Sequence, residues 1–371
     1  MSCESHPIGP VLGQVTAVQA NYYFVQLEPS AEGAAPWPIH NLLCTRQSRL
    51  RKIGQKVMVG DRVTLSEPDW QGKRAAITEV WPRQSELDRP PIANATQILL
   101  VFAIAEPTLD PNQLTRFLIK AESTGLDICL CLSKADLVDA DSQTSWQHRL
   151  QAWGYDPVFI STKQNLGLEA LRQRLTQGTT IVSGPSGVGK SSLINQLIPE
   201  AALRVSAVSG KLGRGRHTTR HVELFQLAEG GLLADTPGFN QPDLTCIPEE
   251  LTQYFPEIAQ RLEAAQCQFN NCRHREEPGC VVGSDWERYP LYRQLLDDAI
   301  AYQQQQQQQA TPDAAFKKVV RGKTEVTYEP RLNRAKYRQT SRRSQQQSVQ
   351  VMKGNVADFL AQNPDGDELE N

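Results

Sequence analysis

The chain has 371 residues, with 39 Lys and Arg against 41 Asp and Glu, so its overall charge neither indicates nor excludes a nucleic-acid partner. This length leaves room for two or three domains, each with its own core. No apolar run approaches the roughly 20 residues of a membrane span, and residues 1–10 lack the basic-then-apolar pattern of a secretory signal, so we expect a cytoplasmic protein with no membrane partner.

Residues 11–88 alternate apolar and polar positions in short runs that Gly, Pro and Asn interrupt. The clearest runs are 13–18, 22–27, 57–65 and 74–80. Several short strands at this spacing predict a small all-β barrel, which we assign to residues 1–90. Within it, eleven residues contain five cations and no acid, as a basic loop between strands would: Arg46, Arg49, Arg51, Lys52 and Lys56.

From about residue 92 strand-like and helical stretches alternate. This pattern predicts a mostly parallel, doubly wound sheet, in a domain that we place at residues 91–245. A strand pair at 222–227 and 231–234 follows. The expected strands are 97–105, 127–133, 157–161 and 179–183, and the expected helices are 111–123, 146–153, 167–175 and 190–197.

A phosphate-binding loop is predicted where Gly-Pro-Ser-Gly-Val-Gly-Lys-Ser, residues 184–191, matches G-x-x-x-x-G-K-[ST] at every fixed position. A strand precedes it and a helix follows it, which disfavours the alternative of a chance Gly-rich turn. Backbone N–H groups would wrap the phosphates, Lys190 would reach the β- and γ-phosphates, and the Ser191 hydroxyl would bind Mg²⁺. The predicted residues are Gly184, Pro185, Ser186, Gly187, Val188, Gly189, Lys190, Ser191 and Ser192.

Residues 235–238, Asp-Thr-Pro-Gly, fit the D-x-x-G element that accompanies such a loop. Asp235 would hold the Mg²⁺ shell through water, and the Gly238 N–H would contact the γ-phosphate. Between the two motifs, residues 210–220 are rich in Gly and Arg and lack apolar periodicity. We predict a mobile switch there, whose Thr218 or Thr219 closes on Mg²⁺ and the γ-phosphate; a solvated basic loop is the alternative.

Two short elements predict recognition of guanine. Ser133-Lys-Ala-Asp136 resembles N-K-x-D, whose carboxylate accepts the N1–H and N2–H₂ donors that adenine lacks, with Ser133 in place of Asn. Lys134 would lay its alkyl stem on the base. Residues 161–163 occupy the place of the S-A-K element, whose backbone N–H recognises O6. The predicted base-binding residues are Ser133, Lys134, Ala135, Asp136, Ser161, Thr162 and Lys163.

The order of these motifs is base, base, phosphate, switch, D-x-x-G, whereas the usual order begins with the phosphate loop. The sequence therefore predicts a circularly permuted domain. Permutation costs little because all five motifs belong to loops at one edge of the sheet. It also makes Asp235–Gly238 lead directly into the C-terminal part of the chain.

The C-terminal segment 246–302 reads as a helical domain with a metal site. Cys267-x₄-Cys272-x-His274-x₅-Cys280 supplies three thiolates and one imidazole within fourteen residues, the set that closes a tetrahedral structural zinc site, one ion per chain. Reduced core cysteines are the alternative, but the intervening residues are polar. We expect residues 303–371 to be a disordered tail: Gln303–Gln309 as a linker, then residues 316–343 with ten Lys and Arg against two Glu, a net charge of +8.

Together these motifs resemble the family of ribosome small subunit-dependent GTPase A, over about residues 10–300. The resemblance implies an OB-fold for the barrel, a helical zinc-binding C-terminal domain, and a monomer that binds GTP or GDP, the 30S subunit and 16S rRNA. It also implies GTP hydrolysis that the 30S subunit stimulates, late in small-subunit maturation. Ser133, the Gln run and the basic tail depart from the common pattern, so the family implies no role for the tail.

The source of catalytic help is open, because position 239 is Phe where Ras-like enzymes place a water-orienting Gln. We therefore expect slow intrinsic hydrolysis. Our hypothesis is that His217, beside Thr218 and Thr219, orients the attacking water, and a solvent-exposed His without a role is the alternative. Two other classes of protein remain as alternatives to a GTPase: an RNA-binding adaptor that does not hydrolyse its nucleotide, and a P-loop ATPase.

Overall fold

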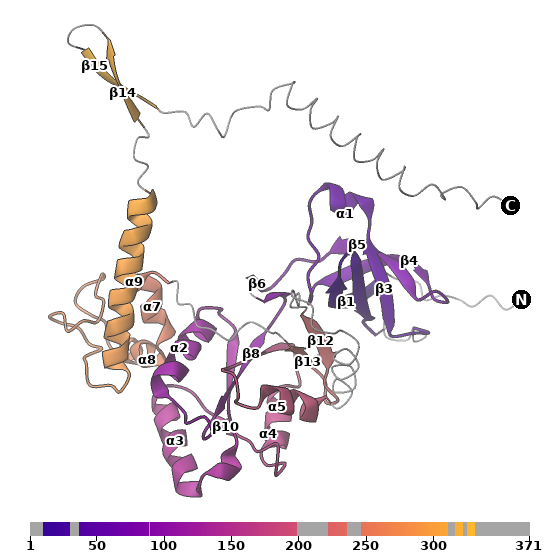
Figure 1. Cartoon of the computed structure of the whole chain (residues 1–371), viewed down its shortest axis with the longest axis horizontal. Helices are drawn as coiled ribbons and strands as arrows, with labels where there is room; N and C mark the ends of the chain where they lie inside the picture. Colours follow the sequence, from indigo (N-terminus) through magenta and orange to yellow (C-terminus); the bar gives the residue numbers. More distant parts are fainter. Residues whose placement is uncertain are drawn as a thin grey trace, which may run out of the picture. The chain divides into compact units, whose positions relative to one another are not determined.

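The computed structural model describes residues 10–29, 37–88, 90–198, 222–235, 246–310, 316–321 and 325–330. The chain up to Gln303 forms one compact unit and the chain from Gln304 another (Figure 1). The first unit contains the barrel, a central domain and a C-terminal helical domain, so the predicted fold class is confirmed. Among the described residues, no helix combines the length and apolar character needed to cross a membrane.

The barrel consists of five strands whose alternate side chains fill one core. The strand order is β1-β2-β3-β5-β4, and a β1–β4 pairing closes the sheet on itself. Val15, Val25, Val63 and Ile77 are fully buried in this core. The strands are β1 (Val11–Gln19), β2 (Tyr22–Leu27), β3 (Asn41–Arg46), β4 (Arg62–Asp69) and β5 (Arg74–Val80).

The predicted basic loop differs from the structure, which places a short helix, α1 (Ser48–Lys52), in it. Arg and Leu are good helix formers, and Leu50, 6% exposed, anchors the turn in the barrel core. The four cations Arg49, Arg51, Lys52 and Lys56 remain exposed on or beside this turn. Strand β3 was not predicted, because its adjacent Leu42 and Leu43 break the alternating pattern.

The central domain is built on the predicted doubly wound sheet, in the order β10-β9-β8-β11-β13-β12. All neighbours pair in parallel except β12, which is antiparallel to β13. The strands are β8 (Gln97–Ala103), β9 (Asp127–Ser133), β10 (Val158–Phe159), β11 (Thr179–Ser183), β12 (Glu223–Gln226) and β13 (Leu232–Asp235). The helices are α2 (Pro111–Glu122), α3 (Ala140–Ala152), α4 (Leu168–Arg174) and α5 (Lys190–Leu197), with the 3₁₀ turn η1 (Ala135–Leu137).

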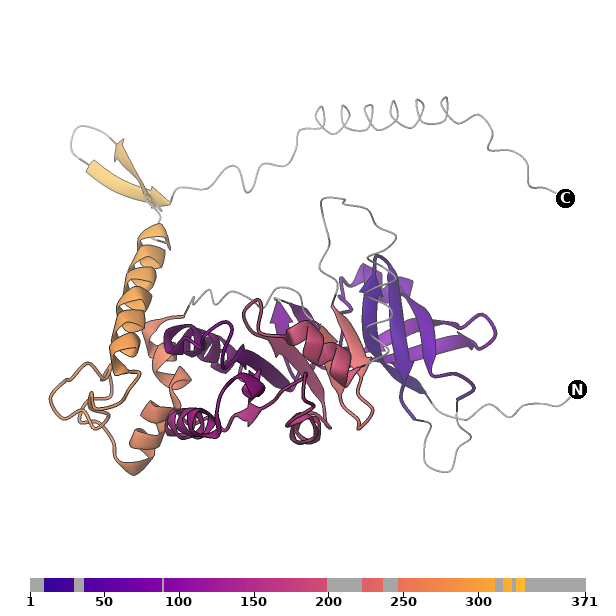
Figure 2. The ribbon, with the colours of Figure 1, turned by 60° about the horizontal axis from the view of Figure 1, so that its bottom comes forward.

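Strand β8 shows why this domain has three layers. Its residues are apolar on both faces, as expected for a strand that helices cover on each side. Ile98, Leu100 and Phe102 pack against the α2–α3 layer. Leu99 and Val101 pack against the α4–α5 layer, on the other side of the sheet (Figures 1 and 2).

The barrel and the central domain share one continuous sheet. β1 pairs with β12 at Ala17 and Glu223, and the Gln26 side chain is hydrogen-bonded to that of Gln226. A two-stranded pair, β6 (Glu86–Asp88) and β7 (Pro91–Ala93), forms the covalent link between the two domains. The barrel is therefore attached to the strand that follows the predicted switch.

The C-terminal domain packs around three aromatic rings. Phe255 makes edge contacts with Trp286 and Tyr292, with ring centroids 5.5 and 5.2 Å apart. Ile119 of α2 joins this core, which fixes the domain to the α2 side of the sheet. The elements are α7 (Pro248–Leu251), the 3₁₀ turn η2 (Thr252–Tyr254), α8 (Pro256–Ala264) and α9 (Tyr289–Ala310).

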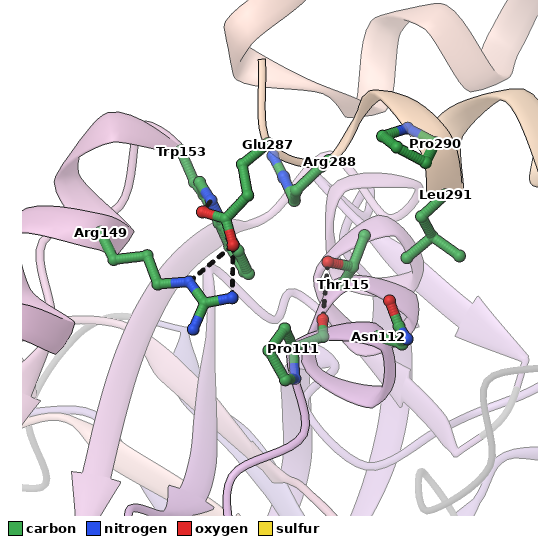
Figure 3. Close-up of a pocket in the computed structure, with 9 residues that line it drawn as sticks. All are labelled: Pro111, Asn112, Thr115, Arg149, Trp153, Glu287, Arg288, Pro290 and Leu291. Carbon is green, nitrogen blue, oxygen red and sulfur yellow. Dashed lines mark hydrogen bonds and ion pairs between the residues drawn. The ribbon is translucent and has the colours of Figure 1, made fainter.

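A buried ion pair of the C-terminal domain lies at the contact with the central domain. The Arg288 guanidinium, almost fully buried, donates to both oxygens of Glu257, with a 2.7 Å Nε–Oε1 distance. It also lies 4.8 Å above the Trp153 ring of the central domain. Beside it, Glu287 accepts hydrogen bonds from Arg149 and from Trp153 Nε1. Arg149, Trp153, Glu287 and Arg288 line an interdomain cleft of about 290 Å³ (Figure 3).

The Gln run differs from the predicted disordered linker. Gln303–Gln309 are helical and form the last turns of α9. Gln is a good helix former, and the first turns of α9 are fixed because Tyr292 and Leu296 are buried in the C-terminal core. Beyond it, part of the expected disordered tail pairs as a hairpin, β14 (Phe316–Arg321) with β15 (Glu325–Pro330).

Candidate functional site

The predicted phosphate loop follows β11 and leads into α5. Gly184 has a φ of +140°, and a Cβ there would lie 2.0 Å from the Val101 carbonyl oxygen, so only glycine fits. Lys190 is the first residue of α5, and its Nζ donates to the carbonyl oxygens of Gly184, at 2.7 Å, and Pro185, at 2.6 Å. The lysine is therefore folded over the loop, where a phosphate group would lie. Backbone N–H groups at the start of α5 are oriented for an anion.

The base motif and the phosphate loop are in direct contact. Ser133, at the end of β9, is 4% exposed. Its hydroxyl lies 2.6 Å from the Val188 carbonyl oxygen and 3.1 Å from that of Phe102. Residues 133 and 188 are 55 positions apart, and the base motif comes first in the chain. The contact is therefore what the permuted order requires if both motifs serve one ligand.

Lys134 strengthens the same connection from a left-handed backbone conformation, with φ +57°. Its Nζ donates to the carbonyl oxygens of Gly187, at 3.1 Å, and Glu106. The segment after β8 that contains Glu106 was missed from the sequence. The signal that could have found it is topological: β8 pairs with both β9 and β11, so its carboxyl end must lie between the two motifs.

The second base element lies beside the first. The Ala135 N–H donates to the Ile160 carbonyl oxygen at 3.0 Å, directly before Ser161. Ser161 is fully buried, and its hydroxyl accepts from the Gln164 N–H at 3.1 Å, which shapes the turn that contains Thr162 and Lys163. Asp136 is half-buried at the same edge. The structure thus brings the predicted base-binding residues together at one edge of the sheet.

Asp235 is the last residue of β13, which lies next to β11 in the parallel sheet. This strand-end position is the one that the sequence predicted for it. His217, Thr218, Thr219 and Gly238 lie outside the described residues.

The Cys/His cluster has the geometry of a metal site. The four ligand atoms of Cys267, Cys272, His274 and Cys280 lie within 4.8 Å of one another. The sulfur atoms are 3.7, 3.6 and 3.5 Å from His274 Nδ1. A tetrahedral zinc ion, bonded at about 2.3 Å to sulfur and about 2.0 Å to nitrogen, holds these atoms about 3.5 Å apart. The donor set and its spacing therefore fit zinc.

Glu277 organises the loop around this cluster. It accepts hydrogen bonds from the backbone N–H of Arg273, at 3.1 Å, and of Arg275, at 2.5 Å. Burial opposes ionisation of Glu277, but its hydrogen bonds with backbone N–H groups outweigh this effect and lower its pKa. The anionic carboxylate thus fixes the backbone on both sides of His274, as an outer-shell group does in metal sites.

The other described cysteines are not candidates for chemistry. Burial raises the pKa of the Cys44 thiol to about 12 and that of Cys129 to about 11, despite opposing hydrogen bonds. Burial also raises the pKa of Cys131 and Cys246. These thiols stay protonated near neutral pH and act as small apolar residues of the core.

Comparison with known proteins identifies the family. The family described as RsgA GTPase matches residues 80–245. The small ribosomal subunit biogenesis GTPase RsgA of Trichormus variabilis is 58% identical over 357 residues, which cover 92% of this chain and 96% of the relative. The chain belongs to the RsgA GTPase family. The RsgA of Thermosynechococcus vestitus is 50% identical over 94% of this chain and 98% of its own length.

Two solved structures share the fold. YjeQ from Thermotoga maritima is 29% identical with a TM-score of 0.64, over 79% of this chain and 99% of the other. YloQ, described as a circularly permuted GTPase, is 29% identical with a TM-score of 0.65, over 80% and 98% of the two chains. The predicted family and circular permutation are confirmed, and the chain is a GTP-hydrolysing enzyme of this family.

Proposed function

We propose that this GTPase binds the small ribosomal subunit, assists its late maturation in the cytoplasm as a monomer, and hydrolyses GTP to GDP when the subunit stimulates it. The observation that carries the proposal is the contact between the base motif and the phosphate loop through Ser133 and Lys134. Relatives named small ribosomal subunit biogenesis GTPase cover 92% of the chain, which supports the choice of particle.

In the proposed nucleotide site, the later motif of the permuted domain binds the phosphates and the two earlier motifs bind the base. Residues 184–192 bind the phosphates, with Lys190 leaving its loop carbonyls for the β- and γ-phosphates and Ser191 binding Mg²⁺. When bound there, Mg²⁺ would neutralise part of the charge of the phosphates. Asp136 accepts the two donors of guanine, and Ser161–Lys163 present backbone N–H groups to O6.

The proposed catalytic residues belong to the switch and to D-x-x-G. Thr218 or Thr219 and Asp235 complete the Mg²⁺ shell, Gly238 contacts the γ-phosphate, and His217 orients the attacking water. Turnover of His217→Ala, measured with saturating 30S subunits, tests the last role. An unchanged stimulated rate would remove His217 from the mechanism.

Two features outside the nucleotide site support binding to the ribosomal subunit and its RNA. The exposed cations Arg49, Arg51, Lys52 and Lys56 form a patch on the barrel that suits phosphate contacts with 16S rRNA. The zinc ion is proposed to hold the C-terminal domain in shape, with Cys267, Cys272, His274 and Cys280 as its ligands. We therefore propose that the barrel and the C-terminal domain, which lie before and after the GTPase domain in the sequence, both contact the ribosomal subunit.

One experiment separates the proposal from its competitors. GTP turnover is measured alone and with added 30S, 50S and 70S particles. The proposal expects slow turnover alone and a large increase with 30S. An adaptor without hydrolysis would bind 30S with no turnover, and an ATPase would lose labelled GTP to competing ATP at equal concentration.

A further inference from the structure

The turn that carries Asp136 is fixed through the backbone of Ala135. Ala135 is 4% exposed, and its N–H donates to the Ile160 carbonyl oxygen at 3.0 Å. Its carbonyl oxygen accepts a hydrogen bond from Gln143 Nε2, also at 3.0 Å. Both polar backbone groups of this buried residue are therefore paired, as burial of an amide group requires.

Gln143 reaches this carbonyl oxygen from the start of α3. Asp139 caps the helix by accepting from the Ser142 N–H at 2.8 Å, and the Gln143 N–H donates to the Asp139 carbonyl oxygen at 3.2 Å. Helical side chains point toward the N-terminus of their helix, so a side chain near the start of a helix covers the segment that precedes it. The half-buried Gln143 is thereby held over the base motif.

Asp136 has no comparable anchor for its side chain. Within the part of the chain that the structure describes, the Asp136 carboxylate forms no hydrogen bond or ion pair. Its direction is therefore set by the backbone, and first by the peptide unit that joins Ala135 to Asp136. This unit is planar and includes the Ala135 carbonyl oxygen and the Asp136 Cα, so a hydrogen bond to the oxygen fixes the plane from which the aspartate projects.

We propose that Gln143 is a positioning residue for base recognition: its hydrogen bond with the Ala135 carbonyl oxygen aims the Asp136 carboxylate at guanine. This inference rests on the proposed function, in which Asp136 accepts the N1–H and N2–H₂ donors of guanine. Two parallel hydrogen bonds form over a narrower range of carboxylate orientations than one does. Loss of the Gln143 hydrogen bond therefore weakens the binding of guanine more than that of a base with a single donor.

The test compares the binding of GDP with that of IDP, whose hypoxanthine base keeps N1–H but lacks the N2 amino group. Both nucleotides displace GDP that carries a fluorophore on its ribose from the full-length protein. In Gln143→Ala, GDP affinity should fall about three- to tenfold, the range of one lost hydrogen bond, and IDP affinity less than about twofold. Gln143→Met keeps the length of the side chain without its donor and should lose as much GDP affinity.

Two further variants locate the effect. Gln151→Ala, at an exposed glutamine near the other end of α3, is the matched control and should bind both nucleotides as the parent does. In an Asp136→Ala background, Gln143→Ala should lower GDP affinity by less than about twofold more, because the carboxylate that it aims is gone.

Three results would overturn the inference and leave the guanine assignment intact. They are unchanged GDP affinity in Gln143→Ala, equal losses of GDP and IDP affinity, and full additivity with Asp136→Ala. Failure of the proposed function looks different. In that case Asp136→Ala alone keeps the parent's preference for GDP over IDP, and the role of Gln143 falls with that of Asp136.

Discussion

The Ser133 hydroxyl lies 2.6 Å from the Val188 carbonyl oxygen and so fastens the guanine motif to the phosphate loop. Serine stands here where the motif usually has Asn. The contact between the base motif and the phosphate loop is kept, because the Ser133 hydroxyl reaches the Val188 carbonyl oxygen directly. We predict that Ser133→Ala weakens GTP binding about three- to tenfold, the worth of a buried hydrogen bond. Titration with a fluorescent GTP analogue measures the change.

Ser123→Ala is the matched control for this substitution. Its hydroxyl donates to the Lys120 carbonyl oxygen at the exposed end of α2, so its removal should leave GTP binding unaltered. Equal affinities of the Ser133→Ala variant and the parent would show that the contact plays no part in holding the nucleotide site.

Asp136 carries the second prediction, which concerns base choice. Asp136→Asn replaces one carboxylate acceptor with an amide donor, so guanine loses a charge-assisted hydrogen bond. GTP affinity should fall about ten- to a hundredfold. Xanthine has a carbonyl oxygen where guanine has N2–H₂, so XTP affinity should rise in the same variant. A variant that binds GTP, XTP and ATP as the parent does would contradict the guanine assignment.

The local motifs of this chain were predictable because each is a short run whose chemistry is contained in its own residues. Residues 184–191, Asp136 and the Cys267–Cys280 spacing are of this kind. Glu106 and Phe102 were not predictable, because their backbone oxygens act whatever their side chains are. Only the placement of β8 between β9 and β11 brings them to the site.

The Gln run is a segment whose own composition gave a wrong prediction of its structure. Its composition favours a linker, yet its place directly after the packed turns of α9 makes it helical. Nucleation is the costly step of helix formation. Burial of Tyr292 and Leu296 in the C-terminal core already fixes the first turns of α9, so the Gln run only extends an existing helix. Composition alone carries no information about what precedes a segment.

Metal removal gives a third prediction. Because the four ligands come from one loop of the C-terminal domain, Cys280→Ser or treatment with a chelator should unfold that loop and lower the thermal midpoint of this domain. Bound zinc should fall from one ion per chain to a small fraction of that, by atomic emission. Cys246→Ala, which alters a buried thiol of the same core, should keep its zinc. Full zinc retention by Cys280→Ser would contradict the ligand assignment.

The buried Arg288–Glu257 pair predicts a pronounced asymmetry between single and double substitutions. Arg288→Met leaves the Glu257 carboxylate buried without its partner, which should cost about 3–5 kcal/mol in the free energy of unfolding. The double variant Arg288→Met/Glu257→Leu replaces both charges with apolar groups of similar size. It should recover most of that loss, because no charge remains buried. Denaturant unfolding of both variants measures the difference, and equal losses would show that packing on Trp153 dominates instead.

The Arg149–Glu287 contact beside it should respond to pH. Burial opposes ionisation of Glu287, but hydrogen bonds from Arg149 and Trp153 outweigh it and lower the pKa of the carboxyl. The folded pKa is therefore below the unfolded value of about 4.3, so the contact stabilises the fold above that pH and is lost as pH falls through the folded pKa.

Both side chains of this pair are more than a third exposed, so we expect Glu287→Gln to cost less than about 1 kcal/mol at neutral pH. The gap between the thermal midpoints of parent and variant should stay constant from neutral pH down to about 5 and narrow below about 4, as pH falls toward the folded pKa. Glu263→Gln, at an exposed carboxyl of α8, is the control and should show no such gap. A gap that does not narrow between pH 5 and pH 3 would mean that Glu287 acts through packing and not through its charge.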